Sequence, residues 1–247
     1  MSAALGGRVG WLAATGAVLR KELRLYFLSP IAWVFLAAFL FIGGLFFVVS
    51  IVTGGEASLR PALANLGIAL VFLLPLLTMR QLAEETRSGT LELLLTAPVP
   101  LSAVILGKWL ATTLVCAVLL VLTLPWAGVL LLYGDPDPGV LVTSYLALLA
   151  CCAAFSAAGL FASSLTKDQM VAGVLGVMML LPFWLASSSR EFAPEILQPW
   201  LDRWSLVEHL RAAAIGVVDT GDVAWFAGFT GVFLFLTWRS LESRRWA

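Results

Sequence analysis

Four charged side chains in one short stretch are the residues of this sequence best placed to do chemistry. Glu84, Glu85, Arg87 and Glu92 lie within nine residues, and long apolar runs flank them on both sides. Hydrocarbon does not tolerate charges at this density, so the stretch must face water or another protein. We expect these four residues to make polar contacts with a partner, and not to act as catalytic groups.

The same stretch also contains an apolar segment, which follows the first three of these charges. Gly89 interrupts the helical pattern, and a short apolar helix ended by Pro98 and Pro100 is predicted to follow it. Its leucines are Leu91, Leu93, Leu94 and Leu95, of which we expect Leu91, Leu94 and Leu95 to form the buried face. A short helix with a charged and an apolar side, held between two membrane spans, is suited to bind in a cleft of a partner protein. The alternative is an ordinary turn between two membrane helices.

The run Glu85–Pro98 resembles the cytoplasmic loop of ATP-binding-cassette exporter permeases of the second class. It is most similar to the branch with the gliding-motility and nitrous-oxide-reductase-maturation permeases. The resemblance implies a coupling helix that sits in a cleft of a separate ATPase subunit, with ATP and Mg²⁺ bound by that subunit and no cofactor in this chain. The coupling residues that it implies are Glu84, Glu85, Arg87, Gly89, Leu91, Glu92, Leu94 and Leu95.

The resemblance also implies a permease subunit that couples ATP hydrolysis to export or to signalling across the membrane. The expected partners are the ATPase, a second permease copy or a paralogue, membrane lipid, and a periplasmic or membrane accessory protein. A membrane scaffold that anchors an assembly and moves no substrate is the alternative function, since an apolar bundle with an interaction loop would have a similar sequence.

The chain's own residues do not form a recognisable enzyme site. A phosphate-binding loop is excluded because Trp109 follows Gly107-Lys108 and Ser102 stands where the first glycine belongs. The single histidine, His209, lies far from the central stretch, and we expect it on the polar face of an interfacial helix. Three cysteines, Cys116, Cys151 and Cys152, lie in apolar runs without metal-ligand neighbours, so we interpret them as small packing residues. No metal site is predicted.

Composition predicts the elements that must position this stretch. Hydrophobic residues make up 61% of the 247 residues and charged residues only 12%, far below the usual quarter. The apolar blocks have the length of ~20 residues that crosses a bilayer as a helix. We therefore predict an all-α membrane protein, a single domain over residues 1–247, with six transmembrane helices at about 31–52, 61–79, 109–133, 140–165, 170–186 and 223–238.

Three polar segments complete the predicted architecture. Residues 1–30 contain an amphipathic helix, Trp11–Leu28, which we expect at the membrane interface, the alternative being a charged stop before the first span. Residues 80–108 form the cytoplasmic coupling segment. Residues 187–221 form an external segment of short helices whose Trp200 and Trp204 suit a membrane interface. Asp222 is a candidate cap for the last span.

The placement of Lys and Arg predicts the orientation. With both termini inside, all but four of the 15 Lys and Arg residues lie on the inner side, the exceptions being Arg60, Arg190, Arg203 and Arg211. The positive-inside rule then places the coupling segment on the cytoplasmic side of the membrane. We expect the protein in the inner membrane of a bacterium. The formal net charge of zero gives no indication of nucleic acid binding. The spans, with these boundaries, have no Asp, Glu, Lys, Arg or His in their interior, so we expect the energy for transport to come from outside the membrane.

Overall fold

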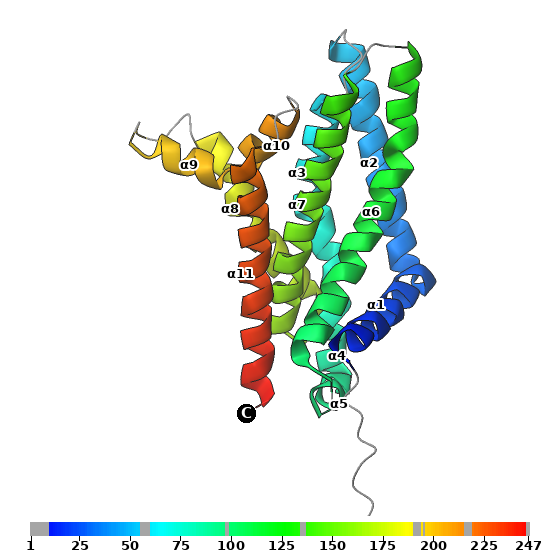
Figure 1. Ribbon diagram of the computed structural model, residues 1–247, viewed down its shortest axis with the longest axis vertical. Helices are drawn as coiled ribbons and strands as arrows, with labels where there is room; N and C mark the ends of the chain where they lie inside the picture. Colours follow the sequence, from blue (N-terminus) through cyan, green and yellow to red (C-terminus); the bar gives the residue numbers. More distant parts are fainter. Residues whose placement is uncertain are drawn as a thin grey trace, which may run out of the picture.

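The structure is a bundle of long helices, with short helices at both of its ends (Figure 1). The computed structural model describes residues 10–54, 60–96, 99–133, 137–189, 194, 196–214 and 219–245. The predicted all-α class with six membrane-spanning helices is confirmed, because six described segments are long and apolar enough to cross a bilayer. The helices are α1 Trp11–Leu28, α2 Pro30–Gly54, α3 Arg60–Thr78, α4 Arg80–Arg87, α5 Thr90–Thr96, α6 Leu101–Tyr133, α7 Pro138–Leu165, α8 Gln169–Ser189, α9 Gln198–Trp204, α10 Leu206–Ala214 and α11 Thr220–Arg245.

The N-terminal helix α1 has the predicted bounds and lies across the α4–α5 end of the bundle (Figure 1). Its main contact is with α6. The two helices cross closely, because a Cβ atom added at Gly107 would lie 2.8 Å from the Val18 side chain. Leu12 and Leu28 remain exposed on α1. The helix is therefore packed onto the bundle on one face while it presents apolar side chains on another.

The third membrane helix begins eight residues earlier than predicted. Proline disfavours the helical conformation in the residue before it, but it is well tolerated at the beginning of a helix. The α6 helix accordingly starts at Leu101, directly after Pro100, whose carbonyl accepts the Ala103 amide at 2.9 Å. Lys108 therefore lies inside α6 and not at the end of a loop. This corrects the predicted boundary, and it places a charged residue within the membrane helix.

The last helix also begins earlier than predicted. It starts at Thr220, and the Asp219 carboxylate accepts the Gly221 amide at 3.1 Å. Asp222 lies in the first turn of α11 and pairs with His209 instead. The predicted cap by Asp222 was therefore wrong, since the residue three positions earlier supplies the carboxylate.

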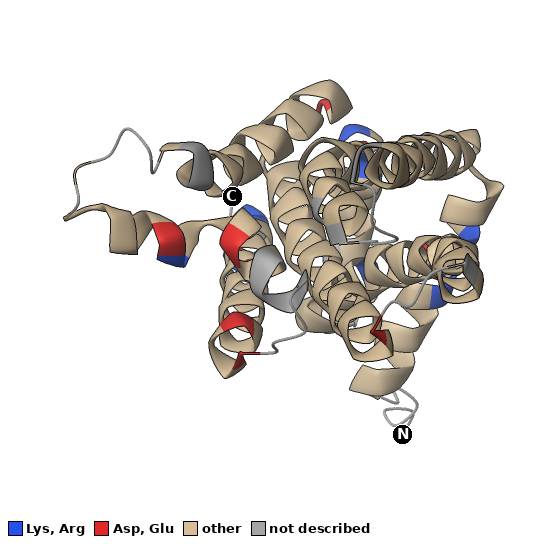
Figure 2. Ribbon diagram, turned by 90° about the horizontal axis from the view of Figure 1, so that it is seen from above, with Lys and Arg blue, Asp and Glu red and all other residues tan. Residues whose placement is uncertain are grey.

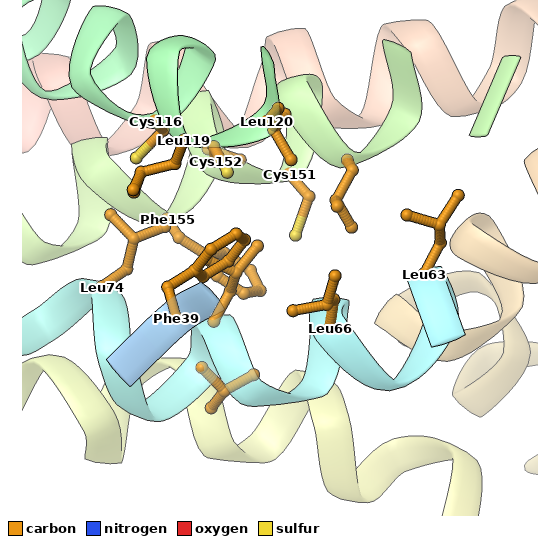
Figure 3. Close-up of a cluster of buried hydrophobic side chains, with 14 of the residues drawn as sticks. Phe39, Leu63, Leu66, Leu74, Cys116, Leu119, Leu120, Cys151, Cys152 and Phe155 are labelled. Atoms are coloured by element: carbon orange, nitrogen blue, oxygen red, sulfur yellow. The ribbon is translucent and has the colours of Figure 1, made fainter. Parts of the chain in front are cut away.

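Helix α7 occupies the centre of the bundle and contacts α3, α6, α8 and α11. Its small residues allow close approach: a Cβ atom at Gly159 would overlap the Thr78 side chain of α3. Figure 3 shows Phe39 and Phe155 packed among leucines of the core. The three cysteines are buried and free in the same region, in agreement with the interpretation as packing residues.

Charged positions occur mainly near the two ends of the bundle. Seen from the α9–α10 end, most of the ribbon carries neither acidic nor basic residues (Figure 2). Helix α4 lies at the opposite end and follows α3 after a single turn residue, Met79. By hydropathy, residues Pro61–Arg87 form one continuous candidate span. The predicted coupling segment is thus a direct extension of a membrane helix.

Candidate functional site

The candidate site is the pair of short helices α4 and α5, which a glycine separates as predicted. Helix α4 ends at Arg87, where the Ser88 amide donates to the Glu84 carbonyl at 2.9 Å. Gly89 then has a φ of +73°, a left-handed conformation that glycine adopts without the steric penalty of a side chain. Helix α5 begins immediately afterwards, at Thr90. The sharp reversal between the two helices therefore depends on Gly89.

A serine from α7 holds the beginning of α4. The Ser163 hydroxyl oxygen accepts both the Leu82 and the Ala83 amides at 3.0 Å, and it donates to the Met79 carbonyl at 2.9 Å. Amides in the first turn of a helix have no partner within that helix. One buried hydroxyl thus satisfies two of them and attaches α4 to the centre of the bundle.

An apolar cluster holds α5 against the same bundle. Leu91 is only 4% exposed and is buried together with Leu82, Ile105, Leu160 and Leu241, while Leu94 packs on the edge of the cluster. Leu93, by contrast, is 72% exposed. The structure thus differs from the expectation that Leu91 and Leu94 face a partner, because their apolar surface is used within this chain. The Leu95 side chain lies outside the described residues.

A buried ionic network connects α4 to α1 and α6. Lys108 is 1% exposed, and its ammonium lies 2.8 Å from the Glu22 carboxylate and 3.0 Å from that of Glu85. It also donates to the Gln81 carbonyl at 2.8 Å. Lys21 contacts the same two carboxylates, Glu85 at 2.9 Å and Glu22 at 3.6 Å. Two ammonium groups thus balance two carboxylates, with Lys108 and Glu22 buried and Lys21 half exposed.

The surroundings of Lys21 in this network favour the charged form of its ammonium group. Burial lowers the pKa of Lys21, but the hydrogen bond and the charge of Glu85, with that of Glu22, outweigh this effect and raise it above its ordinary value. Tyr26 lies beside the network and shares a hydrogen bond with the Thr112 hydroxyl at 3.1 Å. Burial raises the pKa of its phenol well above the ordinary value, so the phenol remains neutral at physiological pH.

Sequence reasoning assigned Glu85 to the site for a different role and missed its partners Lys108 and Glu22. Glu85 points into the chain and not toward a partner. Glu22 is separated from Lys108 by 86 residues, so no local pattern could have indicated their contact. The available signal was the position of Lys108 directly before Trp109, within an otherwise apolar run from Leu101.

The other predicted charged residues remain on the surface. Glu84, Arg87 and Glu92 are all exposed, and Glu84 pairs at 3.2 Å with Arg80, one turn earlier on α4. Leu93 is exposed as well, and we call these four residues the exposed α4–α5 face. A cavity of about 260 Å³ adjoins α4 and is lined by residues of α1, α4 and α6, including the ionic network.

The two predicted interfacial tryptophans lie at the other end of the bundle, on α9. Trp200 and Trp204 are both exposed, and the Trp204 ring lies 6.0 Å from that of Phe183 on α8. The neighbouring helix α10 begins with a serine cap, since the Glu208 amide donates to the Ser205 hydroxyl at 3.3 Å. His209 is largely buried and does not lie on an open polar face. The structure does not bring these residues near α4 and α5 (Figure 1).

Comparison with known proteins gives a family match. The sequence model of the ABC-2 family transporter proteins matches residues 56–207, which is more than half of the chain. The matched region contains α3, the candidate site on α4 and α5, and the central helix α7. A search of curated proteins found no match. With six membrane-spanning helices and this family match, the chain belongs to the ABC-2 family of transporter proteins.

Proposed function

We propose that the chain is the permease subunit of an ATP-binding-cassette exporter complex and that α4 and α5 couple it to a separate ATPase subunit. The observation that carries the proposal is the way in which α4 is held. It extends α3 directly, and it is bound to α7 by Ser163 and to α1 and α6 by Lys108. A force applied to α4 is therefore transmitted to four other helices.

The exposed α4–α5 face is the surface proposed to contact the ATPase. Leu93 supplies apolar area, and Glu84, Arg87 and Glu92 supply charges around it. Interfaces between proteins combine a buried apolar centre with a polar rim in this way. The ATPase would bind ATP and Mg²⁺, and a second copy or a paralogue of this chain would complete the permease.

A charge placed on the exposed α4–α5 face tests the docking surface. We expect Leu93→Asp to lose the ATPase on purification, because burial of an unpaired carboxylate costs several kcal/mol and each 1.4 kcal/mol is tenfold in affinity. Expression and thermal stability should not change, since Leu93 is exposed in the isolated chain. The measurement is co-purification with the ATPase, together with stimulated ATP hydrolysis.

Leu197→Asp is the matched control, because Leu197 is also an exposed leucine but lies beside α9 at the opposite end. This variant should retain the ATPase. If Leu93→Asp bound the ATPase as tightly as Leu197→Asp does, the coupling surface would not be on α5. If the ATPase remained bound but its activity never depended on this chain, the scaffold function would be favoured.

In the proposed orientation the chain lies in the inner membrane of a bacterium, and α4, α5 and both termini face the cytoplasm. The three native cysteines are buried, so an introduced cysteine can be labelled selectively. We expect Ser88→Cys to be protected from an impermeant thiol reagent in intact cells and to react after the cells are opened. Leu197→Cys should react in intact cells. Labelling of Ser88→Cys from outside would reverse the orientation and exclude docking of a cytoplasmic ATPase on α4.

A further inference from the structure

A long apolar groove runs between α6, α7 and α11, away from the α4–α5 site. Its volume is about 650 Å³. Its walls include the small residues Ala147, Ala150 and Ala153 of α7 and Ala227 and Gly231 of α11. We propose that this groove is a binding site for one acyl chain of a resident membrane lipid with a primary ammonium headgroup. The proposal goes beyond the permease function and does not depend on it.

The lining of the groove suits a hydrocarbon chain. A Cβ atom added at Gly231 would meet no other atom within 4 Å, so the groove is open at this position. Trp109 lines the end nearer to α4, and its indole N–H is already satisfied by the Ala153 carbonyl at 2.8 Å. An apolar surface inside the bilayer cannot be covered favourably by water. Lipid chains are the apolar molecules that the surroundings supply.

The length of the groove corresponds to one leaflet. Its lining extends from Thr143 to Ala153 on α7 and from Asp222 to Leu234 on α11. At 1.5 Å per residue these segments span about 15 and 18 Å. Half of a hydrocarbon core of ~30 Å is ~15 Å. A single acyl chain of the leaflet at the α9–α10 end therefore fills the groove from its polar end to Trp109.

The residues at the polar end of the groove determine which lipid headgroup can bind there. Asp222 and His209 lie there, with the Asp222 carboxylate 2.6 Å from Nδ1 of His209. Nε2 of His209 lies 3.2 Å from the Arg203 carbonyl oxygen, and the ring stacks on Trp225 at 4.5 Å. Both nitrogens of the imidazole thus already lie within hydrogen-bond distance of an oxygen atom of the protein. The Asp222 carboxylate can still accept further hydrogen bonds, because a carboxylate has about four acceptor positions. A ligand group at this end must therefore donate hydrogen bonds, as a primary ammonium does.

Photo-crosslinking with two lipids tests the site. The full-length protein is reconstituted in nanodiscs with phosphatidylethanolamine that carries a diazirine on one acyl chain, and adducts are mapped by peptide mass spectrometry. We expect adducts to be concentrated on the α7 segment 147–153. The phosphatidylcholine analogue has the same chains but no N–H donor, so its yield there should be about fivefold lower. Asp222→Asn should abolish this difference between the two lipids.

Two glycine variants of α11 distinguish the groove from general lipid contact. Gly231→Leu extends a side chain into the groove and should reduce adducts on α7 at least fivefold. Gly228→Leu is the matched control, because Gly228 also has open space around it but does not line the groove. Equal yields in both variants would overturn the acyl-chain site. Equal yields with the two lipids would overturn the ammonium assignment, and a loss of adducts during ATP turnover by the complex would overturn the assignment as a resident lipid.

Discussion

Replacement of Lys108 by methionine is the perturbation that tests the attachment of α4 most directly. Methionine keeps the apolar length of the side chain but removes its charge and its donors. The ammonium makes contacts of 2.8 Å with Glu22 and 3.0 Å with Glu85. With an effective dielectric constant of ~20, each contact has a gross attraction of roughly 6 kcal/mol, which the desolvation of the charges offsets to a large extent.

The expected net loss follows from the charges that remain. Without Lys108, the Glu22 and Glu85 carboxylates share only Lys21, so the network carries one uncompensated negative charge. Removal of one partner from a buried ion pair costs about 3–5 kcal/mol. Lys21 is half exposed and still contacts Glu85 at 2.9 Å, so we expect the lower end of this range. A loss of ~3 kcal/mol lowers the melting temperature by roughly 6–12 °C for a chain of this size.

The assay is thermal unfolding of the purified chain in detergent, followed by the apparent melting temperature. The control is Arg239→Met, which removes the cation of the exposed Arg239–Glu242 pair at 3.2 Å and should cost less than about 1 kcal/mol. The double variant Lys108→Met with Glu22→Gln restores charge balance and should recover much of the loss. If Lys108→Met melted at the same temperature as Arg239→Met, the buried network would not stabilise the attachment of α4.

Two further predictions concern contacts of α7. Gly159→Ala should destabilise the chain by more than about 2 kcal/mol, because its Cβ atom would overlap the Thr78 side chain, whereas Gly16→Ala has open space and should be neutral or slightly stabilising in the same thermal assay. Ser163→Ala should cost about 1–3 kcal/mol by leaving the Leu82 and Ala83 amides without their acceptor. Amide hydrogen exchange should then increase at the start of α4, and unchanged exchange there would contradict the role assigned to Ser163.

The helices and the break at Gly89 could be predicted because their causes are local. Apolar runs of about 20 residues are sufficient to indicate membrane helices. A glycine between a charged and an apolar run is sufficient to indicate a break, and the φ of +73° at Gly89 shows why glycine is suited to this position. The start of α6 was predicted eight residues too late, because the cytoplasmic segment was extended as far as the charged Lys108. The structure instead uses Pro100 to begin the helix.

The partners of these elements could not be predicted, because they come from distant parts of the chain. Leu91 is buried partly by Leu241 of α11, and the spacing of the leucines in α5 does not indicate which face α11 will cover. The predicted buried face left out Leu93, which is exposed, but it did not indicate that Leu91 would be buried within this chain. His209 and Asp222 are 13 positions apart on separate helices, and they meet only because α10 packs beside α11. Periodicity gives the faces of a helix, but the bundle decides which face is free.

The attachments of α4 differ in chemistry, and this difference bears on how the proposed coupling would work. Polar bonds fix α4 to its neighbours through Ser163, Lys108 and Arg244, whose guanidinium donates to the Ser164 carbonyl of α7 at 2.6 Å and to the Thr86 hydroxyl at 3.4 Å. The helices of the bundle pack mainly through apolar and small side chains, which have no directional bonds to break when helices shift. A displacement of α4 by an ATPase would therefore move the helices that hold it, and it would be accommodated by sliding at their apolar contacts with α2 and α8.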